Sequence, residues 1–280
     1  MLSRVVAVDS ANGAIYGRID TADNAPPALV LNDKEIVLTF DQGPHPTNTE
    51  YILYTLDRFC AKAVFFFTGS AAIANPEMVR EIARRGHTIA AGPWSASADF
   101  ANIPIEDAKS EIEKGLTAVA KAAEGQVAPF FRISTSVPAP DVLAYFRQRG
   151  VSLWSYDIAS GDNEPGITSG QFFNRTLEKI RERGKGVIQF HDTSKVTVDT
   201  LDDILSVARQ SGSKVVQPVP AASFVPKEEY LAGFMRPAPK PPRSSAVSQT
   251  LVEAAKQRIR IRRHAEPQLR HPPRSRQPEG

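Results

Sequence analysis

The sequence predicts an α/β fold, a distorted (β/α) barrel of about seven parallel strands. Short apolar runs alternate with amphipathic helical segments along most of the chain, and the connections between them are short. No glycine-rich phosphate loop follows the first strand, which favours a barrel over a dinucleotide-binding fold. A length of 280 residues gives one large domain enough chain for a sizeable core.

The stretch at residues 34–45, KEIVLTFDQGPH, is the clearest strand signal in the chain. Its apolar run at residues 36–40 predicts a buried strand, and Gly43 and Pro44 predict a turn directly after it. Asp41 therefore stands at the C-terminal end of a buried strand, where α/β barrels place their chemistry. A turn-forming role alone is the alternative at this point, because Asp-x-Gly-Pro is ordinary turn chemistry.

The other elements follow in order along the chain. Each further strand is a short run of apolar and β-forming residues, at 3–9, 63–68, 87–91, 129–133, 151–156, 186–190 and 214–217. Each helix has apolar residues at helical spacing, and several begin at Pro or Asn and end at Gly, at 48–59, 76–85, 104–123, 140–149, 169–183 and 200–209. Residues 11–33 are rich in turn formers and predict a loop with short extended pieces.

The chain divides into three predicted parts: an N-terminal extension at residues 1–33, a barrel at 34–218 and a proline-rich, basic tail at 219–280. From Arg236 onwards there are 11 Lys or Arg against 3 Asp or Glu, whereas the rest of the chain has 23 against 28. We expect an irregular, solvated tail in which residues 245–263 have the spacing of one helix. The alternative is a basic arm that contacts an anionic surface such as a membrane, nucleic acid or an acidic polymer.

Several classes of protein are excluded by simple counts. The single cysteine, Cys60, excludes an intrachain disulfide framework and any multi-cysteine metal site. No apolar run approaches the roughly 18 residues of a membrane span. No apolar signal segment follows Met1, which predicts a cytoplasmic protein, or an exported one if the true start lies upstream. The sequence does not indicate an oligomeric state.

Polar residues stand at or soon after the ends of several predicted strands: Asp41, Arg132, Asp157, Asp162 and His191. In a parallel barrel these ends meet at one rim. There Asp41 and His191 would form a base and acid pair, because histidine titrates near neutrality. A carboxylate beside His191 would fix the ring tautomer and raise its basicity. Taken singly, each residue has a structural alternative, such as Arg132 in a salt bridge.

Five short motifs in this order resemble the polysaccharide deacetylase family, the NodB homology domain of carbohydrate esterase family 4, over residues 34–218. The family motif T-F-D-D-G-P corresponds to TFDQGP at residues 39–44, and G-H-x-I-x-x-H-x-W-S-H to GHTIAAGPWSA at 86–96. R-x-P-Y corresponds to RIST at 132–135, and D-S-x-D-W to ASGDN at 159–163. The fifth motif, L-x-H-D, ends at His191 and Asp192, with its apolar residue displaced or replaced by Phe190.

The resemblance implies a distorted barrel that removes acetyl groups from N-acetylated sugars with the help of a divalent metal such as zinc. By the same resemblance, Asp41 is the base and His191 is the acid. Arg132 would orient the base, and Asp162 would tune the acid. Two further residues are expected at substrate-binding positions: Trp94 and Asp157.

The metal positions are where the chain departs from the family pattern. The family's ligand Asp and its two ligand His correspond to Gln42, Gly92 and Ala96. Zinc in a catalytic site takes about three protein ligands, and a neutral amide is a poor substitute for a carboxylate, so we expect no bound metal. The motif residues of the groove differ as well, at Ser134, Thr135 and Asn163.

Three functions are compatible with this pattern. The first is a deacetylase-like protein of carbohydrate metabolism that binds an N-acetylated glycan but is inactive or strongly impaired. Its activity would be low because loss of the metal removes both a Lewis acid and an activated water. The second is an active hydrolase on the amide C–N bond of such glycans, with a rebuilt or absent metal site. The third is an interaction protein that acts through its basic tail. Whether the chain is an enzyme stays open at this point.

Overall fold

Strand β3 (Glu35–Asp41) lies at the centre of a sheet whose strand pairings are parallel. β9 (Gly186–His191) pairs along one edge of β3. On the other edge, β10 (Lys214–Pro220) pairs with the beginning of β3, and β4 (Val64–Phe67) pairs with its end. The computed structural model describes residues 1–11, 15–16, 29–133 and 138–233.

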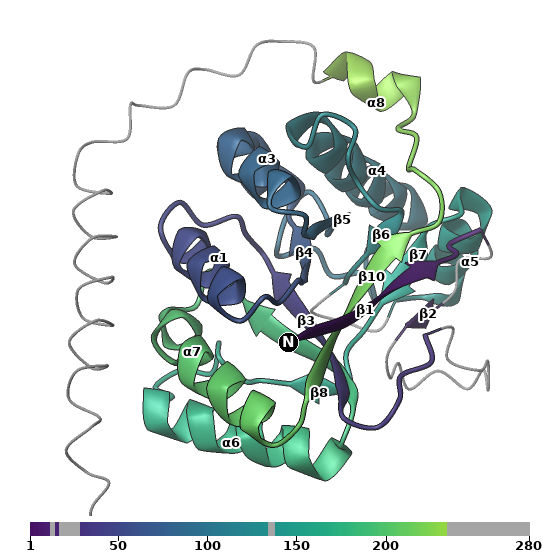
Figure 1. The fold of residues 1–280 in the computed structure, drawn as a ribbon. Helices are drawn as coiled ribbons and strands as arrows, with labels where there is room; N and C mark the ends of the chain where they lie inside the picture. Colours follow the sequence, from purple (N-terminus) through teal and green to yellow (C-terminus); the bar gives the residue numbers. More distant parts are fainter. Residues whose placement is uncertain (12–14, 17–28, 134–137, 234–280) are drawn as a thin grey trace, which may run out of the picture. The chain divides into compact units, whose positions relative to one another are not determined.

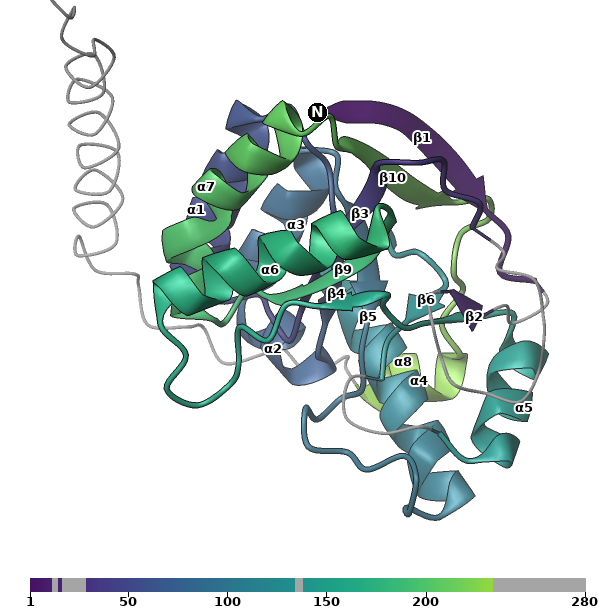
Figure 2. The same ribbon diagram turned by 90° about the horizontal axis from the view of Figure 1, so that it is seen from below.

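The sheet extends outward from these four strands (Figure 1). From β4 it continues through β5, β6 and β7 to β2, while β8 pairs with β9 and β1 pairs with β10. These six strands are β1 (Leu2–Val8), β2 (Ile15–Tyr16), β5 (Thr88–Ala91), β6 (Phe130–Phe131), β7 (Ser152–Trp154) and β8 (Ile158–Ala159). Figure 2 shows the strands curling around an interior with helices outside them. The predicted α/β class and distorted barrel are confirmed.

Most of the helices that cover the sheet lie close to their predicted ranges, whereas those at residues 69–74 and 228–233 were not predicted. The helices are α1 (Asn48–Arg58), α2 (Gly69–Ala74), α3 (Pro76–Arg84), α4 (Ile105–Ala122), α5 (Pro140–Arg149), α6 (Ser169–Arg183), α7 (Lys195–Gln210) and α8 (Glu228–Gly233). In α6 a capping box formed by Thr168 and Gln171 satisfies N-terminal amides, and Gly184 ends the helix in the left-handed conformation. α7 begins at Lys195, before the expected residue 200.

Some expectations are corrected by the structure. The irregular segment predicted from residue 218 is only partly correct: β10 runs to Pro220 and α8 forms at Glu228–Gly233, whereas residues 221–227 between them are irregular. The two-residue strand β8 was missed because so short a segment has no detectable period, whereas β2 falls within the short extended pieces expected at residues 11–33. The helix expected at residues 245–263 lies outside the described residues.

Side chains of β3 and β9 alternate between two cores. Ile36, Leu38 and Phe40 pack in the core that includes residues of the surrounding helices, whereas Val37 belongs to a second cluster inside the barrel. Since side chains alternate along a strand, Asp41 points inward with Val37. β9 repeats the pattern, with Val187 inside, so His191 also points inward, and its Cα is paired in register with that of Asp41.

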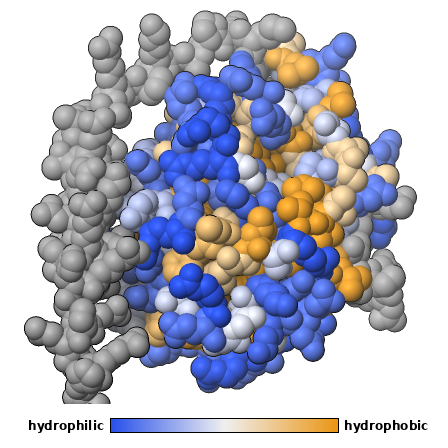
Figure 3. Space-filling view, viewed as in Figure 1, coloured by the Kyte–Doolittle hydropathy of each residue, from blue (hydrophilic) through white to orange (hydrophobic). Residues whose placement is uncertain are grey.

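The outer strand β1 carries exposed apolar side chains, Leu2 and Val5. Figure 3 shows hydrophobic surface in the region where β1 and β10 lie in Figure 1. Among the described residues, none of the helices has the length and apolar character needed to cross a bilayer.

Candidate functional site

Asp41 and Arg132 form a buried ion pair at the C-terminal end of β3. Arg132 Nη1 donates a hydrogen bond to Asp41 Oδ1 at 2.8 Å, and both side chains are 1 % exposed. The guanidinium also donates to the main-chain oxygens of Trp154 and Ser155, and it lies 4.2 Å from the centre of the Phe66 ring. Arg132 is therefore fixed by hydrogen bonds in its plane and by an aromatic face, a geometry that suits guanidinium.

Two residues that sequence reasoning missed complete the surroundings of this pair. Gln189 Nε2 donates to Asp41 Oδ2 at 2.6 Å, and the Thr39 hydroxyl accepts a hydrogen bond from Arg132 Nη1. When His191 is aligned with the family motif L-x-H-D, position 189 holds the motif leucine, so the polar residue Gln189 replaces it. The alternation of side chains along a strand could have identified both residues, because Thr39 and Gln189 each lie two positions before an inward-facing rim residue.

His191 and Asp162 form the second polar pair. His191 Nδ1 lies 2.7 Å from Asp162 Oδ1, and the His191 main-chain amide donates to Asp162 Oδ2 at the same distance. The Thr197 hydroxyl also donates to Asp162 Oδ2. Burial lowers the pKa of His191, but the hydrogen bond and charge of Asp162, with the charge of Asp41, outweigh it and raise the pKa above its ordinary value. The expected contact between Asp162 and His191 is present, and it favours a protonated imidazole.

Asp192 is a fully buried carboxyl beside this pair. Burial raises its pKa to about 7, against the opposing effects of the Thr49 hydroxyl and the His45 amide. Thr49 Oγ1 donates to Asp192 Oδ2 at 2.7 Å, whereas Oδ1 has no hydrogen-bond partner. A Cβ at Gly43 would stand 1.8 Å from Asp192 Oδ2, so glycine is required where the chain crosses this carboxyl.

Asp192→Asn is expected to remove a pH-dependent loss of stability. The pKa of Asp192 is about 7 in the folded protein and near 3.8 when unfolded, so its stabilising contribution is complete below about pH 4 and is lost as the pH rises to 7. A rise of about three units corresponds to about 4 kcal/mol at most. The raised pKa of His191 also makes stability fall as the pH rises, but it does so in both the wild-type protein and the variant. Urea unfolding should show the variant gaining stability over wild type at pH 8 but not at pH 4; an equal difference at both would contradict this.

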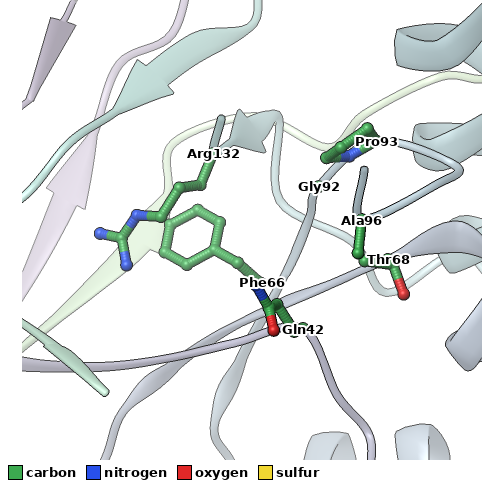
Figure 4. A pocket seen from close by; sticks show the side chains of 7 residues that line it. All are labelled: Gln42, Phe66, Thr68, Gly92, Pro93, Ala96 and Arg132. Atoms are coloured by element: carbon green, nitrogen blue, oxygen red, sulfur yellow. The ribbon is translucent and has the colours of Figure 1, made fainter. Parts of the chain in front are cut away.

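The three positions of the family metal ligands line one small cavity. Gln42, Gly92 and Ala96 surround a space of about 20 Å³ together with Phe66, Thr68, Pro93 and Arg132 (Figure 4). That volume accommodates roughly one water molecule. The alignment of the first two motifs with this chain is therefore spatially consistent, because positions 50 residues apart in sequence line the same cavity.

These side chains do not fit a divalent metal. Gln42 offers a neutral amide, Gly92 has no side chain, and Ala96 has only a methyl group. Arg132 also lines the cavity, but its guanidinium is bonded to Asp41 and has no lone pair to offer a metal. Nowhere in the described part of the chain do three or more His, Cys, Asp or Glu residues form a group that could hold a metal ion.

The two histidines near the metal motifs have other contacts. His45 Nδ1 accepts hydrogen bonds from the amides of Thr47 and Asn48 at the beginning of α1. His87 Nδ1 accepts one from the Ala63 amide, and burial lowers the pKa of His87 to about 3. Neither side chain lines the cavity.

The expected substrate-binding residues lie in different places. Asp157 Oδ2 accepts a hydrogen bond from the Val187 amide near the beginning of β9, so the expectation that Asp157 lies at the rim is wrong. The reason is that the chain turns after β7 and enters β8, whose residues 158 and 159 pair with residues 188 and 189 of β9. Trp94 is half-buried and its ring lies against Gly69, next to the cavity residue Pro93. A substrate contact for Trp94 stays a prediction, and Ser134 and Thr135 lie outside the described residues.

Comparisons with known proteins agree with the motifs. The sequence model of the polysaccharide deacetylase family matches residues 29–154. The peptidoglycan-N-acetylglucosamine deacetylase PgdA of Listeria monocytogenes is 42 % identical over 62 residues, which are 22 % of this chain and 13 % of that protein.

Solved structures share the fold. The peptidoglycan deacetylase Bd3279 of Bdellovibrio bacteriovorus has a TM-score of 0.68 and 29 % identity, over 78 % of this chain and 59 % of that chain. BA3943, a CE4 family pseudoenzyme from Bacillus anthracis, has a TM-score of 0.57 and 16 % identity, over 67 % and 64 % of the two chains. The matches with these three relatives cover less than two thirds of each relative's own length. The order of the motifs, the parallel barrel and these similarities together show that the chain belongs to the polysaccharide deacetylase family.

Proposed function

We propose that this protein is a deacetylase-like member of its family that binds an N-acetylated glycan without removing the acetyl group by the metal-dependent route. The observation that carries the proposal is the cavity formed by Gln42, Gly92 and Ala96. The family as a whole uses a divalent metal, and the three positions that would hold it here provide one neutral amide. A site without carboxylate or imidazole ligands should not retain zinc.

The charges around the cavity support this proposal. Arg132 is paired with Asp41, and His191 is paired with Asp162. Each pair is electrically balanced when the histidine is protonated, so a divalent cation would enter with no unpaired carboxylate from either pair to compensate it. Without the metal, an amide bond loses the group that polarises its carbonyl and lowers the pKa of the attacking water.

The glycan-binding part of the proposal rests on family membership and on relatives named as peptidoglycan deacetylases. A polar rim with a half-buried tryptophan nearby suits a sugar, which presents both hydroxyl groups and apolar ring faces. The nature of the glycan is best approached with N-acetylglucosamine oligomers, because the relatives act on that class of sugar by name.

An active hydrolase is the second candidate, and a specific observation favours it. Asp41 is bonded to Arg132 and His191 is bonded to Asp162, the two contacts that the family resemblance gives to its base and acid. Such an enzyme would need a metal site rebuilt from residues outside the described part of the chain, or a route without metal. The proposed interaction role of the basic tail lies outside the described residues and stays a prediction.

The test is a metal analysis of the purified protein combined with acetate release from, and calorimetric binding to, N-acetylglucosamine oligomers. We expect far less than one zinc per chain after dialysis, no acetate above the blank with added zinc, and saturable glycan binding. Stoichiometric zinc with acetate release would favour the active hydrolase, and absence of saturable binding would remove the glycan from the proposal. The variant Gln42→Asp/Gly92→His/Ala96→His, measured in parallel, shows what the same chain does with metal ligands.

A further inference from the structure

The hydrogen bond between Gln189 and Asp41 has consequences beyond the missing metal ligands. Gln189 is 6 % exposed and lies on the inward face of β9, between Val187 and His191. A buried amide is costly unless its donors are satisfied. Here Nε2 donates to Asp41 Oδ2 at 2.6 Å, a short distance that is typical of a charged acceptor.

Each oxygen of Asp41 accepts a hydrogen bond from a buried side chain, and because the carboxyl is itself buried and does not line the cavity, its remaining lone pairs do not face solvent. Arg132 holds Oδ1 and Gln189 holds Oδ2, and the carboxyl is 1 % exposed. A general base must face the proton that it removes, with a lone pair within hydrogen-bond reach of it or of one intervening water. Arg132 is held by main-chain oxygens, and the Gln189 side chain is buried, which restricts its rotation away from Asp41.

We infer that Gln189 is a positioning residue that fixes Asp41 as the counterion of Arg132, so that this site has lost its proton acceptor as well as its metal ligands. The inference rests on the proposed function and deepens it. Restoring the three metal ligands alone would leave Asp41 restrained by Gln189. Position 189 decides whether Asp41 serves as a structural anion or as a base.

The test adds Gln189→Leu to the zinc-binding variant Gln42→Asp/Gly92→His/Ala96→His. Leucine cannot donate and is shorter than glutamine, so Asp41 Oδ2 loses the hydrogen bond that Gln189 supplies. A positioned general base contributes about 10²–10⁴-fold to a rate, and we expect kcat for acetate release to rise about tenfold or more, with KM and zinc affinity unchanged. Gln189→Met, which keeps the length of the side chain without its donor, is the second variant if Gln189→Leu folds poorly.

Gln217→Leu in the same background is the matched control. Gln217 is equally buried, at 6 % exposed, but its amide donates to the main-chain oxygen of Gly86 at the other end of the barrel strands. Its loss should lower stability without changing kcat. A kcat that is the same with and without Gln189, in both the Leu and Met variants, would overturn the inference while leaving the metal argument intact.

A second measurement does not depend on zinc or on turnover. A crystal structure of the wild-type chain carrying only Gln189→Leu should show an ordered water within hydrogen-bond distance of Asp41 Oδ2. If that oxygen is instead bound by another side chain or main-chain amide, with no water, Gln189 is not what restrains Asp41. Failure of the triple variant to bind zinc would count against the alignment of the metal positions on which the proposed function rests, and this structure would still decide the role of Gln189.

Discussion

The variant Gln42→Asp/Gly92→His/Ala96→His is expected to bind one zinc ion per chain, which the wild-type chain is expected not to do. Space permits each change. A Cβ at Gly92 would have its nearest neighbours at 3.4 Å and 3.5 Å, which is ordinary contact, and Ala96 is exposed. Gln42 has a φ of 69°, a left-handed conformation that aspartate tolerates better than glutamine.

The expected effect is large because three ligands act on one ion. We expect a dissociation constant of about 1 µM or below, equivalent to about 8 kcal/mol. At a hundredfold excess of zinc over that constant the folded state gains about 2.7 kcal/mol, so a zinc-dependent rise in melting temperature gives an independent readout. Titration calorimetry and metal analysis after dialysis measure the binding itself.

Single changes provide the control for this prediction. Gln42→Asp alone supplies one ligand and should bind zinc no more than weakly, because a catalytic site takes about three. Failure of the triple variant to gain zinc while remaining folded would show that the alignment of positions 42, 92 and 96 with the metal ligands is wrong.

Arg132→Met is expected to cost about 3–5 kcal/mol of unfolding free energy, the second large effect. The change leaves the Asp41 carboxylate buried without its partner, and removal of one member of a buried pair has a cost of that size. Methionine keeps an apolar stem against Phe66, so most of the loss reflects charge rather than packing. Urea unfolding followed by circular dichroism measures the difference.

A double variant and a surface pair make this measurement specific. Arg132→Met combined with Asp41→Asn should cost less than the sum of the two single changes, because the second change removes the orphaned charge. Arg84→Met serves as the control, since Arg84 is paired with Glu81 at the surface and such a pair contributes about 0–1 kcal/mol. Equal losses for Arg132→Met and Arg84→Met would show that the buried pair contributes no more than an exposed one.

The alternation of side chains explains which parts of the site could be anticipated. Asp41, Arg132, Asp162 and His191 follow from motif order and strand ends, and the structure brings them together in two bonded pairs. Asp157 was misplaced because a strand end in sequence does not reveal that the chain next pairs in parallel with a different strand, which places Asp157 near the beginning of β9. Gln189 was missed because Phe190 is an apolar residue that can stand for the motif leucine. The inward face of β9, however, contains residues 187, 189 and 191.

The sequence by itself determined the α/β class, the helix boundaries set by Pro, Asn and Gly, and the replacement of the metal ligands by Gln42, Gly92 and Ala96. These are local properties, since caps, periodicity and residue chemistry depend on near neighbours. Only the tertiary structure decided that these three positions line one cavity of about 20 Å³ and that Gln189 binds the second oxygen of Asp41. Both depend on the lateral pairing and register of strands far apart in the chain, which no local pattern specifies.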